Sequence, residues 1–243
     1  MEWRRPPPRA VTQSWSAAPH THGITAGRQS RSCLSLLSGL ADGRPRLLHS
    51  AWVVSICTPV TAVSLIETIM DVRHISPGRN PPQDLHAVIE IPLGGVPVKY
   101  EIDKATGAVF VDRFLHTAMF YPGNYGFIPQ TLSADGDPCD VLVVTQVAVV
   151  PGAVIRCRPV GALVMEDEAG LDEKVLAVPV DDLHPFYTGI KSYRDLPAIM
   201  CEQVAHFFQH YKDLEKGKWV TVVRWLDTEA AEQLVMEAIA RRG

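Results

Sequence analysis

The sequence lacks several patterns that would assign it to a common class of site. Its five cysteines form no C-x-x-C pair and no zinc-binding spacing, so free thiols in a reducing compartment are the simplest account. It has neither a G-x-x-x-x-G-K-[ST] loop nor a helix with the clustered glutamates of Nudix hydrolases. No Ser-His or Cys-His arrangement for nucleophilic catalysis is evident, and no internal repeat is found.

The first 69 residues contain no lysine, and they include one long apolar stretch. Residues 51–66 form an apolar stretch of 16 residues that contains Pro59. This stretch is shorter than a membrane span of about 20 residues, and it lies too far from Met1 for a secretory signal. Residues 1–69 hold seven Arg and three acidic residues, whereas residues 70–243 hold 16 basic and 24 acidic residues. The acidic body argues against a nucleic-acid partner, and no membrane partner is expected.

The change in charge marks a boundary at residue 70. We expect residues 1–69 to be a separate extension, either disordered or the product of a mis-assigned start, with translation beginning at Met70. An Arg- and Ser-rich segment with few acids would also suit an organellar transit peptide. Residues 70–243 are expected to form the working domain, located in the cytoplasm, or in an organelle if the extension is a real transit peptide.

Three carboxylates fall within one tight turn, Asp135-Gly136-Asp137-Pro138-Cys139-Asp140. The apolar run of residues 141–144 predicts a buried strand that holds this turn in place. Oxygen-only ligands suit a hard cation such as Mg²⁺ or Mn²⁺. A solvated acidic turn is the alternative. An EF-hand calcium loop does not fit, because Gly136 comes too early and Gln146 replaces the closing Glu.

A second acidic cluster ends the apolar run of residues 160–165. Asp167 and Glu168 precede the turn Ala169-Gly170, and Asp172 follows it. Two carboxylate clusters at two strand ends could bind more than one divalent cation between them. The alternative is a charged hairpin tip without a ligand.

Cationic and phenolic side chains accompany these acids. Lys99 and Glu101 alternate with apolar residues, so they share one face of a predicted strand. The other members are Arg113, Tyr121, Tyr125, Tyr211 and Lys212. Each of them alone fits a structural role, Tyr211 for example as a core aromatic with a hydrated hydroxyl.

Period-two alternation predicts strands over residues 87–92, 97–103, 108–114, 140–145, 154–166 and 173–180. Their lengths and β-branched content favour an antiparallel sheet curled into a barrel. A long amphipathic helix is expected over residues 197–214. A last helix is expected to be capped by Asp227 or Thr228 and to end at Arg241-Arg242. The predicted class is α+β, mainly β.

In their order, these segments resemble the soluble family I inorganic pyrophosphatases, in particular the bacterial type, over residues 85–225. The matching stretches are Val88-Ile89-Glu90-Ile91-Pro92, Lys99-Tyr100-Glu101-Ile102-Asp103-Lys104, Phe110-Val111-Asp112-Arg113-Phe114, Met119-Phe120-Tyr121-Pro122-Gly123-Asn124-Tyr125-Gly126, the acidic turn, and residues 155–161, 167–170, 205–208 and 211–215. Cys139 stands where the family usually has an aliphatic residue, and Cys can pack as a small hydrophobe.

The resemblance implies that residues 70–243 are an inorganic pyrophosphatase domain. Its implied reaction is Mg²⁺-dependent hydrolysis of pyrophosphate to two orthophosphates by direct attack of a metal-bound hydroxide, without a covalent intermediate. It implies several Mg²⁺ ions per site, with Mn²⁺ or Zn²⁺ as substitutes. The implied metal ligands are Asp135, Asp140, Asp167 and Asp172, and the implied base is Asp137. Phosphoryl oxygens would be held by Lys99, Arg113, Tyr125, Tyr211 and Lys212, with support from Glu90, Glu101, Tyr121 and Lys174.

The resemblance also implies the family fold, an OB-like five-stranded barrel with flanking helices, and assembly into a homohexamer. His206 and His210 lie one helical turn apart and could meet a neighbouring subunit. Two other functions stay open from the residues alone. One is a phosphoanhydride hydrolase that acts on nucleotides, and the other is a binding module that kept the barrel but lost catalysis. The second is disfavoured because no implied metal ligand or phosphate-binding lysine is missing.

Overall fold

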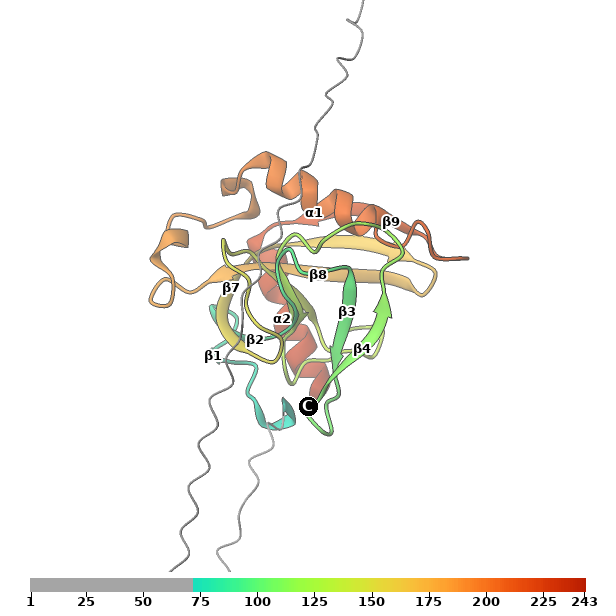
Figure 1. Cartoon of the computed structure of the whole chain (residues 1–243). Coiled ribbons are helices and arrows are strands. Elements are labelled where there is room, and N and C mark those ends of the chain that lie inside the picture. The colour runs from blue at the N-terminus through green and yellow to red at the C-terminus, as the bar shows by residue number, and fades with distance from the viewer. Residues whose placement is uncertain (1–71) are drawn as a thin grey trace, which may run out of the picture. The chain divides into compact units, whose positions relative to one another are not determined.

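The computed structural model describes residues 72–243, so the expected extension over residues 1–69 lies outside the described residues. Figure 1 shows the elements in chain order. They are the 3₁₀ turn η1 (Val72–His74), strands β1 (Gly78–Asn80), β2 (Asp84–Ile91), β3 (Val98–Ile102), β4 (Val109–Phe114), β5 (Asn124–Phe127), β6 (Asp140–Val143), β7 (Val154–Asp167) and β8 (Gly170–Pro179), the 3₁₀ turns η2 (Pro185–Tyr187) and η3 (Tyr193–Asp195), helix α1 (Ala198–His210), strand β9 (Val220–Leu226) and helix α2 (Thr228–Arg242).

Five strands form a closed ring. The main sheet has the order β1-β2-β5-β6-β8-β7-β9, and β2 also pairs with β7, which joins β2, β5, β6, β8 and β7 into a barrel. This confirms the predicted OB-like barrel of mainly β class with flanking helices. Strand β5 is absent from the predicted strands, because Pro122 and Gly123 favour a turn between Tyr121 and Tyr125. Tyr125 instead lies within β5, which pairs with both β2 and β6.

The expected antiparallel pairing holds for every pair of neighbouring barrel strands except one. β6 and β8 run parallel, with Asp140 opposite Lys174 and Val141 opposite Val175. Parallel pairing brings the beginnings of both strands to one end of the barrel. The acidic turn that precedes β6 therefore lies beside the first residues of β8, where Asp172 is found.

β3 and β4 form a separate two-stranded sheet rather than part of the ring. The register shifts between Lys99 and Tyr100, so that Lys99 pairs with Arg113 and Tyr100 with Val111. Asp112 is the extra residue of this bulge. A bulge lets neighbouring residues of one strand turn toward the same side, and Asp112 and Arg113 both approach the side occupied by Lys99.

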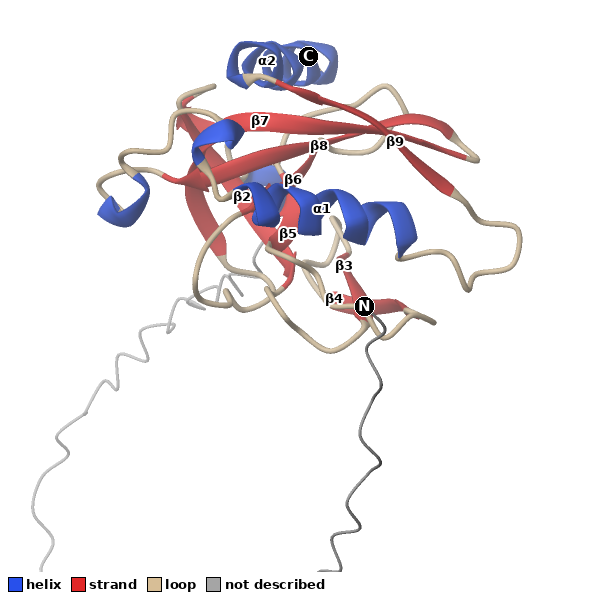
Figure 2. Ribbon diagram, turned by 90° about the horizontal axis from the view of Figure 1, so that it is seen from above, coloured by secondary structure: helices blue, strands red, loops and turns tan. Residues whose placement is uncertain are grey.

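The barrel strands are buried on both faces. Alternate residues of β6 enter different clusters: Val141 packs with Val235 of α2, and Leu142 packs with Phe207 and Phe208, which belong to α1. The two helices thus cover different sides of the sheet (Figure 2). Full burial of a Phe side chain stabilises by roughly 1.5–3 kcal/mol, so Phe207 and Phe208 fix α1 firmly over the end of the barrel.

Both predicted helices are present, with corrected ends. α1 ends at His210 instead of continuing to residue 214, and the N–H of Tyr211 donates to the carbonyl of Phe207 at 2.8 Å. Asp227 is the N-cap of α2, and its side chain accepts from the N–H of Ala230 at 3.1 Å. Within residues 72–243, neither helix has the length and apolar composition needed to cross a membrane.

Candidate active site

A charged cavity of about 340 Å³ opens at the end of the barrel where β6 and β8 begin. It is lined by most of the residues that the sequence predicted for the site: Glu90, Lys99, Glu101, Arg113, Tyr125, Asp135, Asp137, Asp140, Asp172, Lys174, Tyr211 and Lys212. Asp167 and Tyr121 are not among its lining residues. Lys104, Phe127 and Pro138 also line it, although the sequence had given them no role.

The acidic turn is held in shape by its own backbone. The N–H of Ser133 donates to the carbonyl of Asp137 at 2.7 Å, and the N–H of Asp137 donates to a carboxylate oxygen of Asp135 at 3.0 Å. Gly136 has φ of +94°, in a region that residues with a side chain rarely adopt. The glycine therefore allows Asp135 and Asp137 to stand on one tight loop at the cavity.

Lys174 lies between the two acidic segments. Its ammonium group contacts Asp140 and lies 2.6 Å from an oxygen of Asp172. Burial disfavours the charge of Lys174, but attraction to Asp140 and Asp172 outweighs burial and raises the Lys174 pKa. The pKa of Asp172 is raised, because burial and the nearby charges of Asp140 and Asp135 together outweigh the attraction to Lys174.

The donor set fits a hard divalent cation. Asp135, Asp140 and Asp172 offer only oxygen ligands, and the cavity lining contains no His or Cys. Among residues 72–243, no group of three Asp, Glu, His or Cys side chains already has the geometry to hold a metal ion. Lys174 occupies the space between two of them and balances their charge. A cation that displaced this ammonium would meet carboxylates that are already partly desolvated.

The opposite wall comes from the β3–β4 hairpin. The ammonium of Lys99 lies 2.5 Å from Glu101 and 3.3 Å from Asp112. Burial disfavours the charge of Lys99, but these carboxylates outweigh burial and raise the Lys99 pKa. Arg113 Nη1 donates to Asp112 at 3.2 Å. Asp112 thus joins the two cations and keeps both at the cavity, a role that the sequence alone did not reveal.

The turn that follows α1 supplies Tyr211 and Lys212. The ammonium of Lys212 donates to Asp167, at the end of β7, at 2.7 Å. Burial favours the neutral acid of Asp167, but the contact with Lys212 outweighs it and lowers the Asp167 pKa. Asp167 therefore stands behind Lys212 at the edge of the site, whereas Asp172 lines the cavity directly.

Glu90 and Tyr121 support the cavity from inside the fold. Glu90 is buried and accepts a hydrogen bond from the N–H of Ile102 at 2.8 Å. Burial raises the pKa of Glu90 to about 7. The ring of Tyr121 lies 5.2 Å from that of Tyr125 and 4.6 Å from that of Phe207, so Tyr121 packs behind the residue that lines the cavity.

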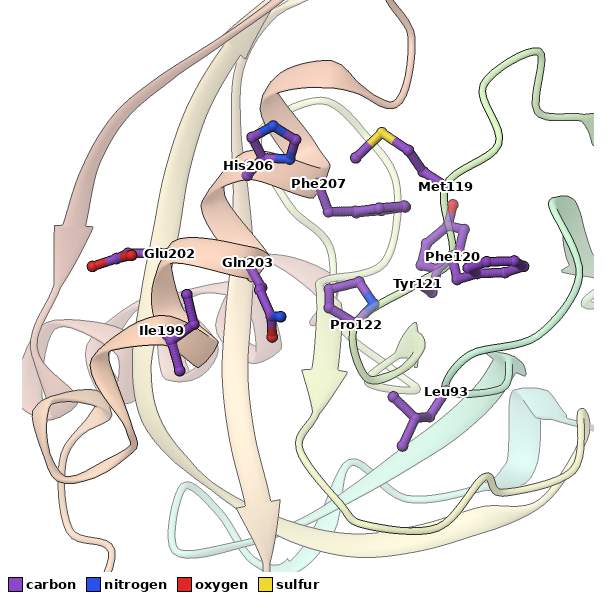
Figure 3. Close-up of a pocket in the computed structure, with 10 residues that line it drawn as sticks. All are labelled: Leu93, Met119, Phe120, Tyr121, Pro122, Ile199, Glu202, Gln203, His206 and Phe207. Atoms are coloured by element: carbon purple, nitrogen blue, oxygen red, sulfur yellow. The ribbon is translucent and has the colours of Figure 1, made fainter. Parts of the chain in front are cut away.

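A second cavity, of about 570 Å³, has Tyr121 among its lining residues (Figure 3). Its walls are largely apolar and come from the segment around Phe120 and from one face of α1, which includes Ile199 and His206. This cavity is larger than the charged one, but it lacks the facing carboxylates and cations. The smaller cavity is therefore the candidate active site.

The fold and the charged cavity define the class of protein: a barrel enzyme whose site suits a small, highly charged anion together with hard cations. A family model described as Inorganic pyrophosphatase matches residues 87–242. The chain belongs to the inorganic pyrophosphatase family, as the bacterial type of the soluble family I enzymes, and it is an enzyme of the inorganic diphosphatase class.

Individual relatives agree. The chain is 66% identical over 172 residues to an inorganic pyrophosphatase of Caulobacter vibrioides, which covers 71% of this chain and 97% of the relative. It is 59% identical to one of Bradyrhizobium diazoefficiens, with the same coverage of 71% and 97%. The solved structure of an inorganic pyrophosphatase from Coxiella burnetii is 48% identical, with a TM-score of 0.68 over 70% of this chain and 100% of that chain. That of Thermus thermophilus is 44% identical, with a TM-score of 0.67 over 71% and 98%.

Proposed function

We propose that this chain hydrolyses inorganic pyrophosphate to two orthophosphates in a Mg²⁺-dependent reaction. The observation that carries the proposal is that one cavity combines two kinds of charged side chain. Its lining contains carboxylates of the acidic turn and of β8 together with Lys99, Arg113, Tyr211 and Lys212. Pyrophosphate is a compact anion without an apolar part. Its binding site therefore needs cationic side chains and also metal cations that the protein binds.

The proposed metal ligands are Asp135, Asp140 and Asp172, with Asp167 at the edge of the site. Glu90 and Glu101 would orient the ions and their waters. Bound Mg²⁺ would neutralise phosphoryl oxygens and lower the pKa of the attacking water. The crowding of Asp135, Asp140 and Asp172 supports this assignment, since three negative charges near one cavity require a positive partner. Mn²⁺ or Zn²⁺ could substitute, and several ions per site are proposed.

Asp137 is proposed as the base. Its carboxylate would accept a proton from the attacking water as the water oxygen forms a bond to one phosphorus. The bond from that phosphorus to the bridging oxygen then breaks, and the second phosphate leaves. Lys99, Arg113 and Lys212 would hold the charged oxygens, and Tyr125 and Tyr211 would donate hydrogen bonds. Burial raises the pKa values of Tyr125 and Tyr211, so both phenols keep the proton that they donate. No covalent intermediate is required.

The measurement for the proposal is phosphate release from pyrophosphate by purified protein, with Mg²⁺ and with a chelator. We expect release with Mg²⁺ and almost none with the chelator. ATP in place of pyrophosphate distinguishes this activity from a nucleotide hydrolase, for which ATP would be the better substrate. Failure to release phosphate from pyrophosphate with Mg²⁺, Mn²⁺ or Zn²⁺ would contradict the proposal.

Assembly and location complete the proposal. A homohexamer is supported by the apolar second cavity, whose lining includes Phe120 and Ile199 (Figure 3). These two side chains are 55% and 61% exposed. The rings of His206 and His210 lie 4.6 Å apart on α1. A cytoplasmic location, or an organellar one if residues 1–69 are a transit peptide, is supported by the free thiols of Cys139, Cys157 and Cys201. The net negative charge of residues 70–243 supports the absence of a nucleic-acid partner.

A further inference from the structure

Arg113 and Glu215 form an ion pair beside the charged cavity. Arg113 Nε lies 3.2 Å from Glu215 Oε1, and both atoms are buried without a hydrogen-bonding partner of good geometry. The Glu215 side chain is only 12% exposed. The two opposite charges compensate one another's partial desolvation, while the Arg113 side chain stays 32% exposed to solvent. Arg113 lines the cavity, whereas Glu215 is not among the lining residues.

The two contacts of Arg113 fix the orientation of its guanidinium group. A guanidinium has five N–H donors in a planar fork. Glu215 faces Nε, and Asp112 accepts from Nη1 at 3.2 Å. With these two contacts, the plane of the Arg113 guanidinium cannot rotate freely. The remaining donors of the fork are then the ones that can meet phosphoryl oxygens, in the paired geometry that Arg offers to phosphate.

Glu215 is well placed for such a role because its own backbone is fixed. Its N–H donates to the carbonyl of Lys212 at 2.8 Å, within the turn that brings Tyr211 and Lys212 to the cavity. Thr117, just after β4, donates from its hydroxyl to the carbonyl of Tyr211 at 3.4 Å. The pair of Arg113 and Glu215 therefore joins the wall from β4 to the wall from the end of α1.

We infer that Glu215 is a positioning residue, which holds the Arg113 guanidinium in the orientation that binds a phosphoryl group. This inference rests on the proposed function, in which Arg113 grips pyrophosphate. Ordering a free Arg side chain costs conformational entropy. Glu215 orders the Arg113 side chain before substrate arrives, so that most of this entropic cost is no longer part of substrate binding. The effect of Glu215 is therefore on substrate affinity and not on proton transfer.

The test is a double-mutant cycle on the full chain, with pyrophosphate and Mg²⁺. Glu215→Met keeps the side-chain volume but removes the charge and the acceptor. We expect kcat/KM to fall roughly tenfold, mostly through KM, with the unfolding temperature nearly unchanged. Arg113→Ala should lose more, and the double variant should lose no more than Arg113→Ala. Glu215→Gln should recover part of the loss, because its amide oxygen still places a partial negative charge beside Nε. Glu229→Gln, at an exposed position in the first turn of α2, is the matched control.

Each outcome decides a different point. Kinetic constants of Glu215→Met within twofold of the wild type, or a double-variant loss equal to the product of the single losses, would overturn the role of Glu215. Unchanged constants in Arg113→Ala would overturn the proposed grip of Arg113 on substrate, a failure of the proposed function itself. If Glu215→Met does not fold, Glu215→Gln decides: a KM raised about threefold at an unchanged unfolding temperature supports the inference, and an unchanged KM overturns it.

Discussion

The ammonium of Lys174 lies 2.6 Å from the carboxylate of Asp172, its neighbour two positions earlier on β8. Residues two apart on a strand share one face, and the parallel pairing with β6 adds Asp140 to the same ammonium. Lys174 therefore compensates the two carboxylates that we propose as metal ligands. The ammonium of Lys174 therefore links the proposed metal site to the stability of the metal-free protein.

Removal of Lys174 should make the fold depend on metal. Lys174→Met leaves Asp140 and Asp172 without their buried partner, which costs roughly 3–5 kcal/mol in a buried pair. We expect a large fall in the unfolding temperature in EDTA and a larger recovery on addition of Mg²⁺ than the wild type shows. Lys216→Met, at an exposed lysine, should behave like the wild type. Equal Mg²⁺ stabilisation of the Lys174 variant and the wild type would contradict the coupling.

Glu90 should make the metal-free protein less stable as pH rises. Burial raises the pKa of Glu90 to about 7, above that of the same group in the unfolded chain. The folded state therefore binds the proton more tightly, and the stability from Glu90 is present in full below the unfolded pKa and lost as pH rises toward 7. Relative to Glu90→Gln, the wild type should lose about 3 kcal/mol of unfolding free energy between pH 4.5 and pH 8 in EDTA. Denaturant unfolding of both proteins measures this difference, and parallel pH curves would contradict the account.

The face around the second cavity should hold the subunits together. Phe120→Asp places a charge on an apolar surface that we propose to be buried between subunits. We expect the molar mass from light scattering to fall from that of a hexamer to a smaller species, with the barrel still folded by circular dichroism. Val147→Asp, at a still more exposed apolar position outside the lining of this cavity, should keep the assembly. A wild-type protein that is monomeric at micromolar concentration would contradict the proposed assembly.

Residues 1–69 should be dispensable. A protein that begins at Met70 retains every residue of the charged cavity and the whole segment that matches the family. We expect it to fold and to hydrolyse pyrophosphate within twofold of the full chain under Mg²⁺. An insoluble or inactive shortened protein would contradict the proposed boundary. Peptides from residues 1–60 in native material would favour a real transit peptide or anchor over a mis-assigned start.

The sequence predicted most of the residues that line the charged cavity, because they lie in short, contiguous motifs that resemble the family. Lys99, Arg113 and the pair Tyr211-Lys212 each fit a structural role when taken alone, and only the order of the motifs singled them out. Strand β5 was missed because Pro122 and Gly123 favour a turn just before it, and Gly126 gives no strand signal. Gly126 is needed for packing, since a Cβ there would collide with the carbonyl of Val88 on β2. That requirement exists only in the folded barrel.

Contacts between distant segments also could not be predicted from the sequence. The parallel register of β6 and β8 puts Asp140 beside Lys174, and no local pattern distinguishes parallel from antiparallel pairing for two short apolar strands. The role of Asp112 depends on a bulge in β4, and that of Glu215 on the docking of the turn after α1. Charged residues in exposed turns usually remain solvated, so their chemistry becomes visible only when the fold brings a partner to them.

The most direct measurement of the central claim is pyrophosphate hydrolysis by Asp137→Asn beside the wild type. Asn keeps the volume of Asp but cannot accept the proton of the attacking water. General-base catalysis contributes about 10²–10⁴-fold, so we expect kcat to fall by a factor in that range while the unfolding temperature and Mg²⁺ stabilisation stay near those of the wild type. Wild-type turnover in a folded Asp137→Asn protein would remove Asp137 from the mechanism and contradict the account of this cavity.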